Sequence, residues 1–137
     1  ARILKTPRFF LFDVGVRNAL ARLPLEAGIL ATEGGGLFEH WVACELAGRI
    51  GYLGRSHRLS FWRTVDGAEV DLVLETPREA IPIEVKWTDK PQPGDARHIE
   101  TFLDLHPSRA RRGFVVCRVP RPQQLTDRVT AIPWQQL

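Results

Sequence analysis

The feature that most constrains the fold is a change of hydrophobic period near Leu59. Before that point, from about Gly36 to Ile50, apolar residues recur at the spacing of a helix. From Leu59 onward apolar and polar residues alternate, which is typical of half-buried strands. The alternation predicts strands at 59–64, 69–75 and 80–87, with turn residues at Asp66-Gly67 and Thr76–Glu79. These segments together predict a three-strand meander.

The rest of the chain predicts helices and strands around this meander. The expected elements are a short buried strand at 8–12, a helix at 14–23 closed by Pro24, a break at the glycine triplet 34–36, a helix at 36–50, a helix at 95–106, a buried strand at 113–118 and another strand at 129–133. This order indicates an α/β fold with one mixed central sheet flanked by helices. A length of 137 residues fits one domain. We expect residues 1–33 to form a connecting strand and helix and residues 34–137 to form the core.

Composition narrows the class of protein. With 44% hydrophobic and 26% charged residues, the chain is typical of a globular protein. No apolar run reaches the roughly 18 residues of a membrane span. The two cysteines, Cys44 and Cys117, lack metal-type spacing, which favours a reducing compartment and a cytoplasmic location. Met is absent and no phosphate-binding loop occurs, so we expect a fragment of a longer chain whose other part would carry any nucleotide-driven activity.

Charge is unevenly distributed along the chain. Residues 1–24 carry five bases and one acid (+4), residues 25–90 seven bases and eleven acids (−4), and residues 91–137 seven bases and four acids (+3). An acidic middle between basic flanks suits a cation site beside a phosphate-binding surface. An ordinary mixed surface explains the same distribution.

The turn at 76–79 sets a register that brings charged residues together. A four-residue loop pairs Glu75 with Ala80, so Asp71 stands opposite Glu84 and Glu69 opposite Lys86. Two opposed carboxylates repel unless a cation lies between them, and a divalent ion bound through oxygen is the natural candidate. The Lys86 ammonium could then stabilise charge developing on a phosphate. The alternative is a solvated sheet face with a weak Glu69–Lys86 pair.

Several further residues have both a functional and a structural interpretation. Glu39 lies on a fairly apolar helix flank, where a carboxylate usually has a partner, and it could complete the cluster. A two-residue turn at 66–67 would put Arg63 on the apolar face, so a bulge or a longer loop is expected, and Trp62 is more readily explained by core packing than by base stacking. The best candidates for sequence-independent phosphate contacts, with a solvated loop as an equal alternative, are Arg109, Arg111 and Arg112. The histidines show no zinc spacing and are expected in solvated or core positions, among them His98.

The order of these residues resembles a known superfamily. Glu39 on a helix, Asp71 on a strand and Glu84-Val85-Lys86 on the next strand resemble the PD-(D/E)xK nucleases, whose core is a helix, a three-strand meander, a helix and a strand. The segments FDVGVR (12–17), GLFEHWVA (36–43), FWRT (61–64) with GAEVD (67–71), and IPIEVK (81–86) resemble an uncharacterised domain that lies C-terminal to the ATPase module of prokaryotic AAA-type proteins. The resemblance covers roughly residues 8–105. Val70 stands where the superfamily usually has proline.

The resemblance implies a restriction-endonuclease-like core and a metal-dependent site. It assigns Asp71, Glu84 and Glu39 as ligands of Mg²⁺ or Mn²⁺, and Lys86 as the catalytic lysine. The expected function is hydrolysis or binding of DNA phosphodiesters, in one chain with an ATPase module. The competing hypothesis is a catalytically silent module of such an ATPase, which binds nucleic acid or a protein. Self-association through Phe9, Phe10 and Trp134 is a further expectation.

Overall fold

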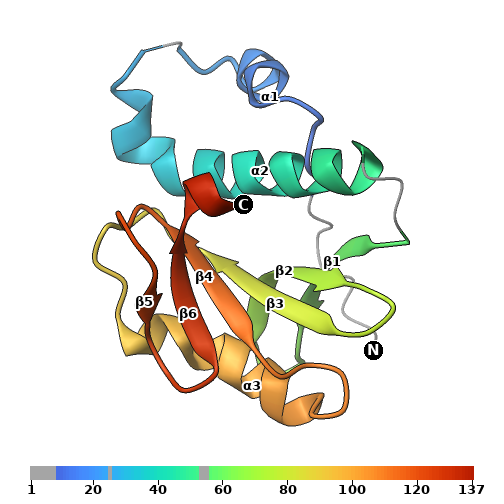
Figure 1. Ribbon diagram of the computed structural model, residues 1–137. Coiled ribbons are helices and arrows are strands. Elements are labelled where there is room, and N and C mark those ends of the chain that lie inside the picture. Colours follow the sequence, from blue (N-terminus) through green and yellow to red (C-terminus); the bar gives the residue numbers. More distant parts are fainter. Residues whose placement is uncertain (1–8, 25, 53–55) are drawn as a thin grey trace.

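The computed structural model describes residues 9–24, 26–52 and 56–137. Within these ranges the chain forms a six-stranded mixed sheet with helices on both faces (Figure 1), which confirms the predicted α/β class. The helices are α1 (Val14–Leu20), α2 (Ile29–Tyr52) and α3 (Arg97–Leu105), with 3-10 turns η1 (Pro93–Ala96) and η2 (Trp134–Gln136). The strands, which lie in the order β1-β2-β3-β4-β6-β5, are β1 (Arg58–Arg63), β2 (Glu69–Glu75), β3 (Ala80–Val85), β4 (Gly113–Cys117), β5 (Gln123–Gln124) and β6 (Val129–Pro133).

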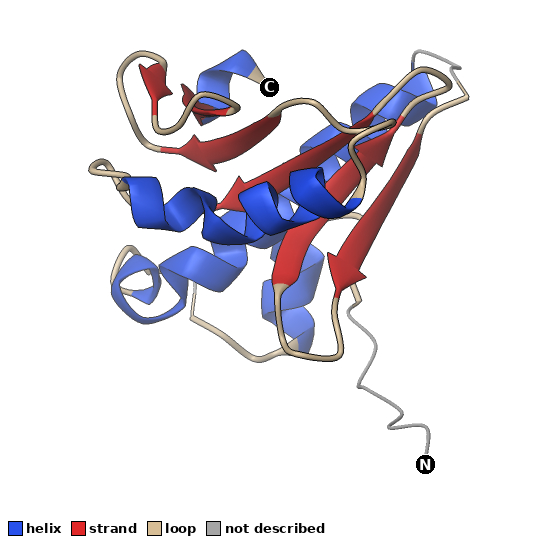
Figure 2. Cartoon of the chain, turned by 90° about the horizontal axis from the view of Figure 1, so that it is seen from below, coloured by secondary structure: helices blue, strands red, loops and turns tan. Residues whose placement is uncertain are grey.

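The predicted meander is confirmed, and so is the register of its second hairpin for residues 72–75 with 80–83. The expected opposition of Glu69 and Lys86 lies beyond this ladder, and Glu69 forms an ion pair with Arg63. Strands β2 and β3 pair antiparallel, with Glu75 opposite Ala80 and Leu72 opposite Ile83. The chain then crosses through α3 to β4, which pairs parallel with β3, and β6 pairs parallel with β4. Figure 2 shows α3 lying across one face of the sheet. The crossover joins the meander to the C-terminal strands in one sheet.

A bulge separates the two halves of the β1–β2 pairing. Ser60 stands opposite Val73, whereas Trp62 stands opposite Val70, so β2 carries one residue more than β1 between these pairs. The loop before β2 is longer than a two-residue turn, because Arg63 stands opposite Glu69 and the Thr64 N–H donates to the Ala68 carbonyl at 2.8 Å. This longer loop, one of the two expected alternatives, keeps Arg63 off the face of Val70, and the bulge lies farther along β2. Trp62 stands opposite Val70 and packs edge-on against Phe102 of α3. Core packing of Trp62 is therefore confirmed.

Two apolar clusters hold the sheet between its helices. On one face Ile99, Phe102 and Leu103 of α3 pack against inward residues of the sheet such as Val70 and Val115. On the other face α2 supplies Phe38, Val42 and Ala43, which pack against Leu72, Ile83, Val85 and Val116. The two faces of β3 are therefore both covered, as in other sheets whose strands are buried on both sides.

The expected buried strand at 8–12 is wrong. Residues 9–12 form no strand, and Phe9 and Phe12 are 80% and 84% exposed; residue 8 lies outside the described part. Among the described residues the apolar run is paired with no strand. Its contact is instead with α2, because the Leu11 carbonyl accepts hydrogen bonds from His40 Nε2 at 2.7 Å and from the Cys44 thiol at 3.0 Å.

The expected break at the glycine triplet is also wrong. Helix α2 runs without interruption from Ile29 through Gly34–Gly36, so the expected boundary between residues 33 and 34 falls inside it. A Cβ atom on Gly34 would lie 2.6 Å from Trp87 Nε1. Glycine therefore permits close helix packing here rather than a turn.

Candidate functional site

Asp71 and Glu84 come together at the open end of the β2–β3 hairpin. Asp71 lies within the bulged part of β2, one step beyond the Leu72–Ile83 pair. Its Oδ2 accepts a hydrogen bond of 3.0 Å from the backbone N–H of Val85. The side chain thus takes a place that a backbone carbonyl would hold in a regular ladder, and this fixes it against β3.

Glu84 is a buried acid. The residue is 5% exposed, and its neighbours Ile83 and Val85 face α2, so Glu84 projects toward α3. Its Oε2 is buried and has no hydrogen-bond partner among the described residues. Burial, together with the Asp71 carboxyl group, raises the pKa of Glu84 to about 9 against a smaller opposing effect of Lys86. At neutral pH Glu84 is therefore protonated and shares a hydrogen bond with Asp71.

This pair can exchange its proton for a cation. Two adjacent carboxyl groups supply oxygen ligands of the kind that Mg²⁺ and Mn²⁺ prefer, and the partnerless Oε2 of Glu84 has a vacant acceptor position. The donor set therefore fits a divalent cation. Mg²⁺ usually takes only one or two carboxylates and completes its shell with water.

Lys86 and His98 lie beside the pair. Lys86 follows β3, is half-buried, and its backbone N–H donates to Val116 O at 2.9 Å. His98, in the first turn of α3, places Nδ1 3.9 Å from Glu84 Oε1. That Nδ1 donates to the Glu69 carbonyl at 3.0 Å, while Nε2 accepts from Arg97 at 3.1 Å, which fixes the neutral tautomer with the proton on Nδ1.

His98 was not among the predicted site residues. Its sequence context, a histidine in the first turn of a helix, gives no chemical signal by itself. The topology does give one, because a helix that follows β3 starts at the edge of the sheet where β3 ends. A histidine at the start of the predicted helix 95–106 therefore lies near Glu84.

Glu39 lies elsewhere. It lines a hollow of about 420 Å³ between α2 and the N-terminal segment, together with Phe10, Leu11, Arg17 and His40. The described residues contain no group of three carboxylate, histidine or cysteine side chains placed to bind one metal ion. The expected three-carboxylate set of Asp71, Glu84 and Glu39 is thus not assembled in this part of the chain, because Glu39 faces the N-terminal segment.

The arginines expected to contact phosphate are divided between the two ends of the hairpin. Arg63 pairs with Glu69 at 3.2 Å, near Asp71. At the far end, Arg109 donates to the Thr76 carbonyl at 3.1 Å and Arg112 pairs with Glu79 at 3.0 Å, while Arg111 is exposed. Only Arg63 of this set lies at the carboxylate end.

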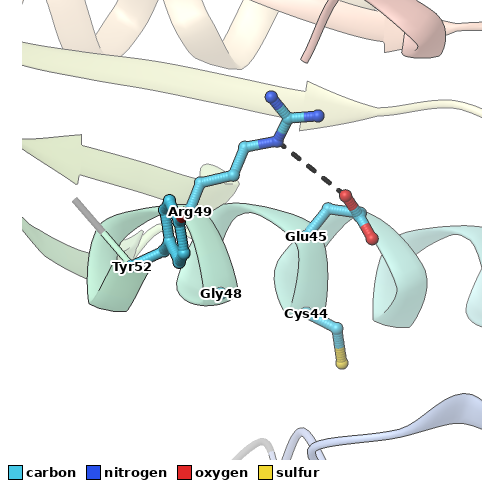
Figure 3. Close-up of a pocket in the computed structure, with 5 residues that line it drawn as sticks. All are labelled: Cys44, Glu45, Gly48, Arg49 and Tyr52. Carbon is cyan, nitrogen blue, oxygen red and sulfur yellow. Dashed lines mark ion pairs between the residues drawn. The ribbon is translucent and has the colours of Figure 1, made fainter.

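Another hollow lies along the last turns of α2. Figure 3 shows Cys44, Glu45, Gly48, Arg49 and Tyr52 around it, with Arg49 reaching back to Glu45 at 3.8 Å. The Cys44 thiol has a pKa above its ordinary value, chiefly because of burial, so it is a poor nucleophile. None of the predicted site residues lines this hollow.

The family described as a domain of unknown function, DUF4143, matches residues 34–137. Neither a curated protein nor a solved structure matches the chain. In the described part of the chain, no helix is long and apolar enough to cross a membrane.

Proposed function

The chain belongs to the DUF4143 family, and we propose that its Asp71–Glu84 pair is the divalent-cation site of a domain that hydrolyses DNA phosphodiesters. The observation that carries the proposal is the buried pair itself, in which Glu84 Oε2 has no hydrogen-bond partner among the described residues. The resemblance to PD-(D/E)xK nucleases adds the reaction type. It also implies a cytoplasmic chain in which an ATPase module precedes this domain.

The residues around the pair have separable roles in this proposal. Asp71 and Glu84 would hold Mg²⁺ or Mn²⁺, which supplies Lewis-acid activation of a phosphate or of a water molecule when bound. Lys86 offers an ammonium that stabilises negative charge on the reacting phosphate. Asp71 is held in position by the Val85 N–H.

A calorimetric titration with Mn²⁺ tests the cation site without requiring the right substrate. We expect saturable binding to the unaltered protein and its loss in Asp71→Asn, which keeps the shape of the side chain but removes the charge. Asp127→Asn is the matched control, because Asp127 is exposed in the turn before β6. Equal binding in all three proteins would overturn the assignment of the site.

The catalytic part is tested by cleavage of plasmid and of single-stranded DNA in the presence of Mn²⁺. Lys86→Ala is expected to abolish cleavage while retaining Mn²⁺ binding, because Lys86 acts on the phosphate and not as a metal ligand. Retained cleavage in Lys86→Ala would contradict the proposed role of the lysine.

A second candidate function is the catalytically silent interaction module. The observation that favours it is the position of Glu39, which leaves the pair without a third carboxylate in the described residues. Such a module would bind DNA or a protein partner equally well with Lys86→Ala and in the presence of EDTA. Metal-dependent cleavage would exclude it.

A further inference from the structure

A pocket of about 310 Å³ lies between α1, the first turns of α2 and Trp87. Its wall is mostly apolar and includes the rings of Phe38, Trp41 and Trp87. Phe38 and Trp41 are parallel, with an interplanar angle of 3°, and Trp87 is tilted against Phe38 with ring centroids 5.2 Å apart. A volume near 300 Å³ with aromatic walls is typical of a site for a small planar ligand.

Asn18 supplies a polar group in this wall. It is 7% exposed, and its Oδ1 accepts a hydrogen bond from Arg17 Nη1 at 3.1 Å. Asn18 lines the pocket, and an asparagine amide group presents a donor and an acceptor side by side.

That pair of groups matches the edge of adenine. An asparagine amide can donate to adenine N7 and accept from its N6 amino group, whereas guanine presents two acceptors at the corresponding positions. Aromatic side chains around the ring add base stacking, which contributes to nucleotide binding without reading sequence.

Trp87 also contacts the guanidinium group of Arg118. The guanidinium carbon of Arg118 lies 4.1 Å from the centroid of the Trp87 ring. Arg118 is not one of the residues that line the pocket, but through Trp87 it places next to the pocket a positive charge that suits the phosphate of a nucleotide. Trp87 is also three residues from Glu84 and one from Lys86, so the pocket and the carboxyl pair lie near the same end of β3, the pocket on the α2 face of the sheet and Glu84 on the α3 face.

We propose that this pocket binds an adenine nucleotide, with Asn18 reading the base and Arg118 contacting the phosphate. The inference rests on the proposed function for its ligand class, since it takes the bound nucleotide to be part of a DNA strand. It does not rest on cleavage or on the cation, so it can be tested without either.

The test is a titration with deoxyadenosine monophosphate in EDTA, followed through the indole N–H signals of the four tryptophans by NMR. We expect the signals of Trp41 and Trp87 to shift and that of Trp62, which packs against α3, to stay in place. Asn18→Asp should weaken binding about tenfold, because the donor is lost. An unchanged Trp62 signal in this variant shows that it is folded.

Two comparisons separate the parts of the proposal. Deoxyadenosine, without phosphate, should bind more weakly than the monophosphate, and Arg118→Gln should remove that difference. Asp71→Asn should leave nucleotide binding unchanged, so that failure of the cation site and failure of the pocket are told apart. No shift of Trp41 and Trp87, full binding by Asn18→Asp, or equal binding of deoxyguanosine monophosphate would overturn the proposal.

Discussion

The two ends of the β2–β3 hairpin differ in what lies next to their carboxyl groups. At the turn end, Arg58 pairs with Glu75 at 2.8 Å and Arg112 pairs with Glu79 at 3.0 Å. A hydrogen bond from Ser60, and then Arg58, holds the pKa of Glu75 below its ordinary value. At the open end two like groups, Asp71 and Glu84, are in contact, and the pKa of Glu84 rises to about 9.

The ion pairs at the turn end are exposed to solvent, whereas the carboxyl groups at the open end are close together and Glu84 is buried, which costs folding free energy. Exposed ion pairs of the turn end contribute little and cost little. A buried acid without a full set of partners destabilises the fold, and such groups cluster at functional sites. The open end is therefore where changes of pH, cation and sequence should have their largest effects.

The largest expected effect is the pH dependence of cation affinity. Glu84 must lose its proton before it can bind a cation, and its pKa is raised to about 9. Mn²⁺ affinity should therefore rise about tenfold for each pH unit between 6 and 8, or about 100-fold in total. Calorimetry in two buffers of different ionisation enthalpy should show about one proton released. A pH-independent affinity would place the cation away from Glu84.

A smaller effect is expected on stability. The pKa of Glu84 is higher in the folded chain than its ordinary value of 4.5, so the folded state binds more protons and stability falls as pH rises from 4.5 toward 9. Glu84→Gln cannot titrate, so its stability relative to the unaltered protein should rise between pH 5 and pH 8, by at most about 1.4 kcal/mol for each pH unit, with little difference below pH 5. Urea denaturation at both pH values measures this. Glu79→Gln, at the turn end, should show no such gain at pH 8.

The smallest effect is expected at the turn end itself. Arg112→Ala removes an ion pair in which the arginine side chain is 60% exposed. The free energy of unfolding should fall by no more than about 0.5 kcal/mol. A loss of several kcal/mol in the same denaturation experiment would remove the contrast between the two ends.

The meander was predictable because residues that are close together in the sequence determine its strands and its turn. Alternation from Leu59 and a four-residue turn fix the pairing of Leu72 with Ile83, and this pairing brings Asp71 to Glu84. The contact of His98 with Glu84 was not predictable from spacing, because it depends on how α3 crosses the sheet.

The predictions failed for segments whose structure depends on residues far away in the sequence. The Phe9–Phe12 run is apolar enough for a strand, but no strand of the described chain lies beside it. Glycines 34–36 have low helix propensity, yet Gly34 lies in a helix because Trp87, more than 50 residues later, packs against it. Glu39 fits the superfamily's order, but the N-terminal segment determines what surrounds it.

The composition of the two apolar clusters has a consequence for the order of folding. The cluster on the α3 face consists of residues from Trp62 to Ala131, which belong to strands and a helix that follow one another closely in the sequence. The α2 side joins Phe38 and Val42 to Val116 and Ile132, contacts that close loops of more than 70 residues. Because long loops cost more entropy to close and form more slowly, we expect α2 to dock late, onto a sheet already held by α3. We then expect the layer that carries the aromatic pocket to be the one most readily released from the rest of the protein.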